Sequence, residues 1–132
     1  TSWILTQSNS FSAAVVHAGV FDLVSQYASD FPWGREQTYG ATPWEDPQKL
    51  ARFSPSYHAQ SITTPVLLLH GERDFRVPVH HSLMMHNVLT GRGVPSRIVL
   101  FPDSGHGIVQ RDAAELWWGE VFGWLNHHLA KQ

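Results

Sequence analysis

The clearest alternation of apolar and polar positions lies in the second half of the chain. A short apolar run predicts a strand at 65–70 that ends at Gly71, and such a run is typical of a parallel strand covered on both faces. A second strand is predicted at 96–101, and a helix at 79–90 separates the two. From Arg111 onward, apolar residues recur with helical spacing over at least four turns. They are Ala114, Trp117, Trp118, Val121, Leu125 and Leu129.

The first half of the chain carries a weaker pattern. Residues 1–7 resemble the end of a helix, and 11–17 resemble a buried strand. The stretch 20–57 is rich in proline and large aromatic residues, which predicts an ordered excursion with short helices at about 21–28 and 46–52. Strands and helices that alternate with short connections form a parallel sheet with helices against its faces. The sequence therefore predicts an α/β fold with three parallel strands and flanking helices.

Composition and charge exclude several classes of protein. The 132 residues carry 9 Lys and Arg against 11 Asp and Glu, a net charge of −2, whereas binders of nucleic acid or anionic membranes need clustered positive charge. Because the chain has no cysteine, disulfide scaffolds, cysteine-ligated zinc and thiol catalysis are excluded. No apolar run approaches the length of a membrane span. We expect a cytoplasmic protein that uses no cofactor and binds neither nucleic acid nor membrane.

The candidate chemistry follows the two strands of the second half. Asp74 lies after the strand at 65–70, and His106 lies after the strand at 96–101. Functional groups gather at the carboxyl ends of parallel strands, so we expect these side chains to meet. A carboxylate that accepts the imidazole N–H fixes the tautomer and stabilises the imidazolium, as in a nucleophile–His–Asp triad. Taken singly, Asp74 also fits a turn-capping carboxylate, and His106 a loop histidine between glycines.

Three segments of the chain resemble one known family. They are HGERDFRVPV, GRGVPSRIVLFPDSGH and TSWILTQ…FSAAVVHAGVFD. In family order and with plausible spacing, they are similar to the C-terminal half of the α/β-hydrolase domain of the prolyl oligopeptidase family, near its acylaminoacyl-peptidase and dipeptidyl-peptidase-like members. The resemblance runs from Thr1 to about Leu129. It implies that Asp74 is the acid of a catalytic triad and that His106 is its general base and acid.

The family nucleophile is a serine in a G-x-S-x-G-G elbow between a strand and a helix, and no G-x-S-x-G occurs in the 132 residues. The resemblance places that serine within about two helical turns before Thr1. We therefore expect residues 1–132 to be a partial α/β-hydrolase domain that lacks its nucleophile-bearing N-terminal part and the oxyanion hole. Ser104 is a poor substitute and is expected to be solvated or to cap a turn. Ser2 is equally poor, because the family places it inside a helix.

The resemblance also implies a substrate pocket. Val20, Leu23 and Tyr27 fall where the family builds part of the pocket for the side chain before the scissile bond, and Val77 matches another wall position. Ordinary core packing explains the same residues. Several family members carry a large aromatic residue where this chain has Leu23, so a less restrictive apolar pocket is expected. Such a pocket suits short peptides or acyl-peptides.

Nine histidines raise the question of a metal site. His80, His81 and His86 share one predicted helix, but a helical site needs ligands at i and i+4, and 81 to 86 is a spacing of five. We therefore predict surface histidines and no metal. His17 and His70 end two strands and are predicted to be hydrogen-bonded groups of the core or of the surroundings of the site.

The leading hypothesis is a fragment of a serine peptidase that hydrolyses short peptides through a Ser–His–Asp triad. An esterase of the same fold is the nearest alternative. A third hypothesis is a catalytically inert fragment, because the strand at 11–17 leaves one sheet edge open, and an uncovered apolar edge pairs with other chains. That edge is expected to bind a second copy or the missing half of the domain.

Overall fold

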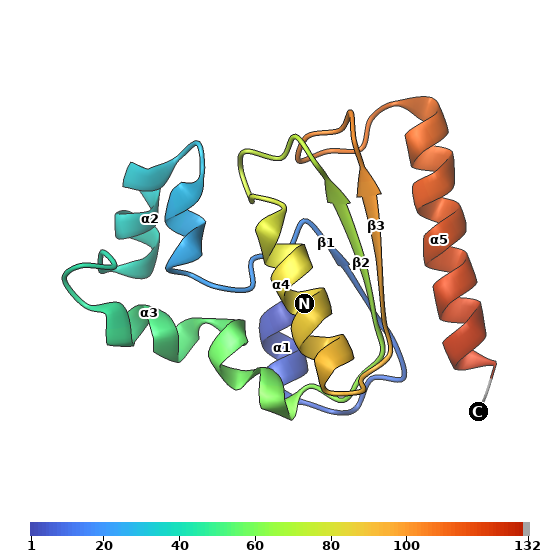
Figure 1. The fold of residues 1–132 in the computed structure, drawn as a ribbon, viewed down its shortest axis with the longest axis horizontal. Coiled ribbons are helices and arrows are strands. Elements are labelled where there is room, and N and C mark those ends of the chain that lie inside the picture. The colour runs from blue at the N-terminus through green and yellow to red at the C-terminus, as the bar shows by residue number, and fades with distance from the viewer. Residues whose placement is uncertain (131–132) are drawn as a thin grey trace.

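The computed structural model describes residues 1–130 and has a three-stranded parallel sheet at its centre (Figure 1). The strands are β1 (Ala14–His17), β2 (Val66–Gly71) and β3 (Ser96–Phe101). Their order is β1-β2-β3, with Val16 opposite Leu68 and Leu68 opposite Ile98. All six residues of β2 are buried, as its unbroken apolar pattern predicts for a central strand. The predicted parallel sheet is confirmed.

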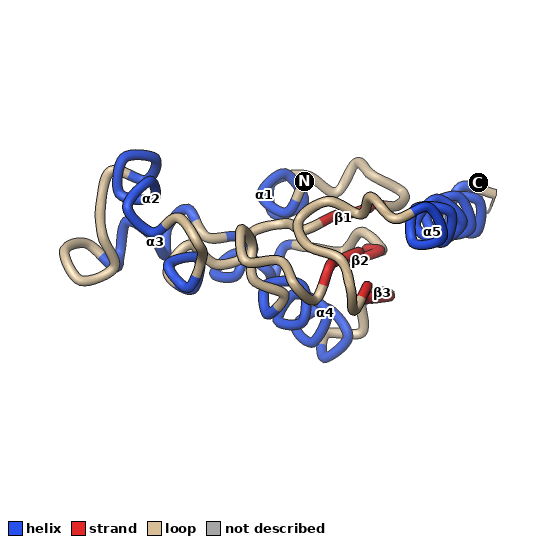
Figure 2. Tube along the Cα trace, turned by 90° about the horizontal axis from the view of Figure 1, so that it is seen from above, coloured by secondary structure: helices blue, strands red, loops and turns tan. Residues whose placement is uncertain are grey.

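Helices cover both faces of the sheet. The α-helices are α1 (Ser2–Gln7), α2 (Pro32–Tyr39), α3 (Pro47–Phe53), α4 (His80–Gly91) and α5 (Arg111–Leu129), and the 3₁₀ helices are η1 (Ser25–Ala28) and η2 (Pro55–Ser61). Figures 1 and 2 show α1 and α4 on one side of the strands and α5 on the other. Helices α2 and α3 extend away from the sheet and form a lobe of their own (Figure 1).

Two hydrophobic clusters hold these layers together. The cluster on the α1 and α4 side contains Leu5, Val16, Leu68, Met85 and Leu89 among its buried residues. The cluster on the α5 side contains Leu67, Leu69, Phe101 and Val121. Successive side chains of β2 therefore point into different clusters, as the two-residue period of a strand requires. The sheet is thus fixed from both faces, which makes its carboxyl edge a rigid base for a site.

The predicted apolar face of α5 is partly wrong. Trp117, Val121 and Leu125 pack on the sheet, and Trp124 joins them. Trp118 and Leu129, which the pattern assigned to the same face, are 53% and 52% exposed. The apolar positions of α5 cover more than one face, so their spacing alone does not show which of them the sheet buries.

The first half differs more from the prediction. Strand β1 begins at Ala14 instead of residue 11, and the helix expected at 21–28 is only the short η1. Helix α2 was not predicted, although it has Pro32 in its first turn and ends at Gly40, whose φ of +66° is left-handed. This pairing of an initial proline with a terminal glycine is a known helix signal. In the described residues no helix is long and apolar enough to cross a membrane.

Candidate active site

Asp74 and His106 lie in hydrogen-bond contact at the carboxyl edge of the sheet. The Nδ1 of His106 is 2.8 Å from Oδ2 of Asp74, so Nδ1 donates and the carboxylate accepts. In the neutral ring this leaves Nε2 as an acceptor. The Asp74 side chain is fully buried, whereas that of His106 is 54% exposed. The pair therefore joins a shielded carboxylate to an imidazole whose second nitrogen is free to take a proton.

The loop after β2 fixes the carboxylate of Asp74. The other carboxylate oxygen, Oδ1, accepts the backbone N–H groups of Arg76 and Val77 at 2.9 and 2.8 Å. The backbone N–H of Asp74 in turn donates to the carbonyl of Gly71 at 3.1 Å. These bonds form the local turn that an aspartate favours. As a result, the loop itself directs Oδ2 toward His106.

His70, the fifth residue of β2, lies fully buried beneath this carboxylate. Its Nε2 is 2.7 Å from the carbonyl oxygen of Val77 and 3.3 Å from Oδ2 of Asp74. Both neighbours are acceptors, so Nε2 carries a proton, and the hydroxyl of Ser82 donates to Nδ1 at 2.6 Å. Burial lowers the pKa of His70, although the Val77 carbonyl and Asp74 act in the opposite direction. His70 is therefore a neutral donor that supports the acid.

The sequence predicts His70 to be a hydrogen-bonded group, but it gives no indication of Ser82. Ser82 lies on α4, and its hydroxyl reaches the strand histidine twelve residues earlier. No pattern in the sequence marks it, because a lone serine in a helix usually bonds within that helix. The structure thus adds α4 to the elements that position the acid.

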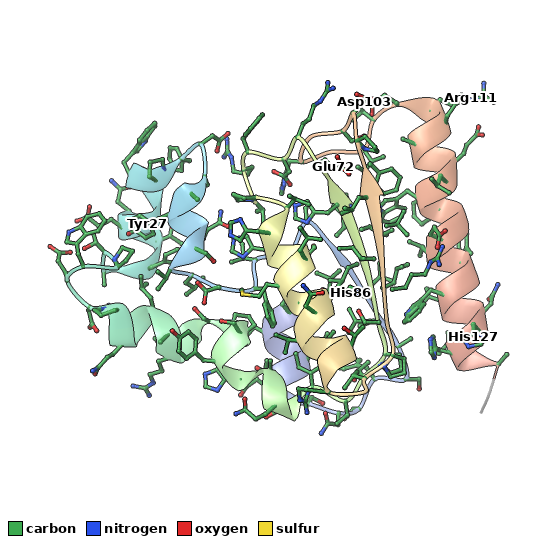
Figure 3. All side chains as sticks on the ribbon, in the orientation of Figure 1. Tyr27, Glu72, His86, Asp103, Arg111 and His127 are labelled. Atoms are coloured by element: carbon green, nitrogen blue, oxygen red, sulfur yellow. The ribbon has the colours of Figure 1, made fainter. Side chains whose placement is uncertain are left out.

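The loop that carries His106 is packed closely onto the end of β2. The backbone N–H of Arg73 donates to the carbonyl of Ser104 at 3.0 Å. A side chain at Gly71 would collide with the backbone of Ser104 and Gly105, so only glycine allows this approach. Figure 3 shows the labelled Glu72 and Asp103 on these two loops at the same end of the sheet.

Of the two roles expected of Ser104, a solvated serine or a turn cap, the first is wrong. Ser104 is 2% exposed, and its hydroxyl donates to Oε1 of Gln110 at 3.1 Å. This bond closes the loop that leads into α5. Its burial gives it a structural role in the loop.

A cavity of about 420 Å³ opens beside the pair. It is lined by Asp30, Arg73, Asp74, Phe75, Arg76 and His106. Arg76 pairs with Asp30, its Nε lying 2.8 Å from a carboxylate oxygen. Phe75 is 71% exposed. A substrate that approaches His106 from this side meets one aromatic ring and a charged rim.

Two of the expected pocket residues share a second cavity. Val20 and Leu23 line a space of about 300 Å³ together with Trp3, His17 and Phe53. This cavity lies between α1, the end of β1 and the segment before η2. Apolar side chains form much of its wall, which suits an uncharged side chain.

Tyr27 and Val77 do not join that cavity. The hydroxyl of Tyr27 donates to the carbonyl of Ala41 at 3.1 Å, and its ring contacts Trp44. Figure 3 shows Tyr27 in the lobe of α2 and α3, far from the labelled Asp103. Val77 is 6% exposed and bonds through its backbone to His70 and Asp74. The packing alternative therefore describes these two residues better than the pocket does.

The prediction of surface histidines is wrong for His81. It is fully buried, and its Nδ1 lies 3.3 Å from the backbone N–H groups of Phe21 and Asp22. These donors tie the segment after β1 to α4, a contact between distant parts of the chain that helical spacing does not reveal. His80 and His86 are half-buried. Within residues 1–130 no group of three or more His, Cys, Asp or Glu side chains is arranged to hold a metal.

Comparison with known proteins assigns the chain to one family. The family model described as the prolyl oligopeptidase family matches residues 1–132. A probable dipeptidyl-peptidase 5 of Aspergillus clavatus is 35% identical over 120 residues, which make up 89% of this chain and 17% of the relative. The dipeptidyl-peptidase 5 of Porphyromonas endodontalis is 33% identical over 126 residues, 92% of this chain and 18% of the relative.

Solved structures of related peptidases have the same fold as this chain. The acylaminoacyl peptidase of Pyrococcus horikoshii superposes with a TM-score of 0.93 at 29% identity, covering 100% of this chain and 22% of that one. An acylaminoacyl peptidase in complex with Z-Gly-Gly-Phe-chloromethyl ketone superposes at 0.85, with 28% identity and coverage of 96% and 21%. The chain thus spans about a fifth of these proteins and has the strand and helix arrangement of an α/β-hydrolase. It belongs to the prolyl oligopeptidase family.

Proposed function

We propose that this chain supplies the acid and the general base of a serine peptidase that cleaves short peptides. The observation that carries the proposal is the 2.8 Å contact between His106 Nδ1 and the buried Asp74 carboxylate. It leaves Nε2 of an exposed imidazole as the free acceptor, which is the state that a general base needs. Membership of a peptidase family supports the same reaction class.

In this proposal each residue has a defined part in acyl transfer. Nε2 of His106 takes the proton of the attacking serine hydroxyl, and Asp74 stabilises the imidazolium that forms. His106 then gives that proton to the leaving amine. A water molecule, activated by the same nitrogen, releases the acyl group and restores the serine. His70 keeps its own proton throughout: its Nε2 donates to the Val77 carbonyl and the Asp74 carboxylate, and its Nδ1 accepts from Ser82.

The nucleophile is proposed to be a serine outside these 132 residues. No G-x-S-x-G is present in the sequence, and Ser104, two residues before His106, is buried and bonded to Gln110. Accordingly, the chain of residues 1–132 should not react with a fluorophosphonate probe. Labelling of this chain would reveal a nucleophile within it and would contradict the proposal.

The direct test uses the full-length protein that carries this sequence. His106→Ala should lower the turnover of an aminoacyl p-nitroanilide by at least about 10³-fold, and Asp74→Asn by a similar factor, because both remove the oriented base. His86→Ala is the matched control. His86 bonds to Ser96 at the amino end of β3, the opposite end of the strand from the site, so its loss should leave turnover unchanged. Undiminished turnover in His106→Ala would refute the assignment.

The substrate is proposed to be a short peptide or an acyl-peptide. Relatives named dipeptidyl-peptidase 5 and acylaminoacyl peptidase support this class. The cavity at Val20 and Leu23 has no charged side chain in its lining, which favours an apolar substrate side chain. The same triad would also cleave esters. Comparing kcat/KM for matched amide and ester substrates separates a peptidase from an esterase.

A second proposal concerns association. Strand β1 pairs with β2 on one edge, and among the described residues no strand pairs with its other edge. An open edge of this kind binds another strand. We therefore expect residues 1–132 on their own to self-associate, or to pair with the remainder of an α/β-hydrolase domain. Light scattering coupled to size-exclusion chromatography tests this, and a well-behaved monomer would contradict it.

A further inference from the structure

His17, the last residue of β1, bridges α5 and the loop that holds His106. Its Nδ1 lies 3.0 Å from the indole Nε1 of Trp117 on α5. Its Nε2 lies 3.0 Å from the backbone carbonyl oxygen of His106. The ring also meets Trp117 edge to face, with ring centres 5.8 Å apart. One imidazole thus connects an edge strand, a helix and the loop of the proposed base.

The two partners determine the tautomer of His17. An indole N–H can only donate, so Nδ1 of His17 accepts, and a backbone carbonyl can only accept, so Nε2 donates. A neutral ring with its proton on Nε2 satisfies both bonds together. Trp117 therefore does more than pack against the ring: it selects the tautomer that can hold the carbonyl of His106.

The loop needs such an anchor at this point. His106 stands between Gly105 and Gly107, and neither a helix nor a strand includes it. Glycines permit many backbone conformations, so their loop must be held by bonds from outside. Before His106, the carbonyl of Ser104 accepts from the backbone of Arg73. At His106 itself, the bond from His17 fixes the peptide group that follows the residue.

We infer that His17 is a positioning residue for the general base. This inference rests on the proposed function of His106. By holding the His106 carbonyl, His17 sets the direction of the Cα–Cβ bond and keeps the half-exposed imidazole aligned with Asp74 and with an incoming nucleophile. A misplacement of about 1 Å can cost about 100-fold in rate. His17 itself touches no reacting atom, so its effect on the alignment of His106 appears in kcat, whereas a change in KM reports on the cavity at Val20 and Leu23 that His17 also lines.

Two amide substitutions in the full-length protein separate this role from simple packing. The amide of Gln reaches the position of Nε2 and can still donate to the carbonyl, whereas the shorter amide of Asn reaches only the position of Nδ1. We expect His17→Asn to lower kcat by about 10- to 100-fold. His17→Gln should keep kcat within about threefold. Equal kcat values for the two variants would overturn the inference.

A matched control is available elsewhere in the chain. His58 also has its Nε2 close to a backbone carbonyl, that of Arg52 at 2.8 Å, and also meets a tryptophan ring edge to face. His58→Asn should leave kcat unchanged. A loss of kcat in His58→Asn equal to that in His17→Asn would show a general effect on stability and would overturn the inference.

Two further measurements keep the result decisive. If His17→Asn fails to fold, Trp117→Phe takes its place, because it keeps an aromatic ring and removes the N–H that selects the tautomer. A three- to tenfold lower kcat is then expected, and an unchanged kcat overturns the inference. His106→Ala is assayed in parallel. If it is inactive while His17→Asn is fully active, the inference fails and the proposed function stands; if His106→Ala is active, the proposed function itself fails.

Discussion

Replacing Gly71 with alanine tests how closely the acid and base loops must approach each other. Gly71 ends β2, and a Cβ at this position would collide with the backbone carbonyls of Ser104 and Gly105. The new Cβ would be attached to the backbone of the buried central strand and would meet the backbone of a loop that is bonded to Arg73. No side-chain rotation relieves the contact, so the loop that carries His106 has to move.

The structure sets the size of that movement. The carbonyl carbon of Ser104 would lie 2.7 Å from the new Cβ, whereas ordinary van der Waals contact begins at 3.4 Å, and the carbonyl oxygens of Ser104 and Gly105 would lie closer still, so the displacement exceeds about 0.7 Å. A shift of that order at a catalytic group lowers kcat by about 10- to 100-fold. Overpacking of this kind also destabilises a fold by about 1–3 kcal/mol.

Two assays check the prediction. Turnover of an aminoacyl p-nitroanilide by the full-length protein reports on alignment, and thermal unfolding of the same variant reports on stability. Gly123→Ala is the matched control, because a Cβ at Gly123 meets nothing within 4 Å on α5. It should stabilise the helix by about 1 kcal/mol and leave kcat unchanged. Wild-type kcat in Gly71→Ala would refute the idea that loop approach aligns the base.

Three further changes are predicted to affect stability. Burial lowers the pKa of His70 below the ordinary value of 6.5. The contribution of the neutral ring to folding stability is therefore fully present above pH 6.5 and is lost as the pH falls through the folded-state pKa. His70→Gln should flatten the decline in melting temperature from about pH 7 to about pH 5, and an unchanged slope would contradict this. The Arg92 guanidinium donates to three backbone carbonyls at the end of η2. Arg92→Ala should therefore cost about 2–3 kcal/mol in urea unfolding, with Arg92→Lys intermediate, and a loss below about 0.5 kcal/mol would argue against that role. Asp46 caps α3 by accepting the N–H of Lys49 at 2.9 Å, so Asp46→Ala should cost about 1 kcal/mol and Asp46→Asn much less; equal losses would exclude the cap.

The sheet and its edge were predictable because their signals are local. The run at β2 is apolar throughout and short, which only a strand covered on both faces explains well. Strand β3 and helix α4 begin and end within one residue of their expected bounds, and α5 begins at the expected Arg111. Once those strands are parallel, Asp74 and His106 must lie at one edge. The candidate pair therefore follows from topology and residue type.

The interactions that orient the pair were not predictable in the same way. The donation from Ser82 to His70, the bridge from Trp117 through His17, and the burial of His81 all join residues that are distant in sequence. Such contacts depend on how helices rotate against the sheet. Apolar spacing fixes that rotation only loosely, as the exposed Trp118 of α5 demonstrates.

The position of the pair within one β2–α4–β3 unit has a consequence for folding order. Asp74 and His106 are 32 residues apart, and pairing β2 with β3 closes the segment between them without help from other elements. The entropy cost of closing such a segment grows only slowly with its length. The acid and base should therefore come together when this unit first forms. The base takes its final orientation only when His17 of β1 and Trp117 of α5 have packed beside this unit, so an incompletely folded chain holds no active triad.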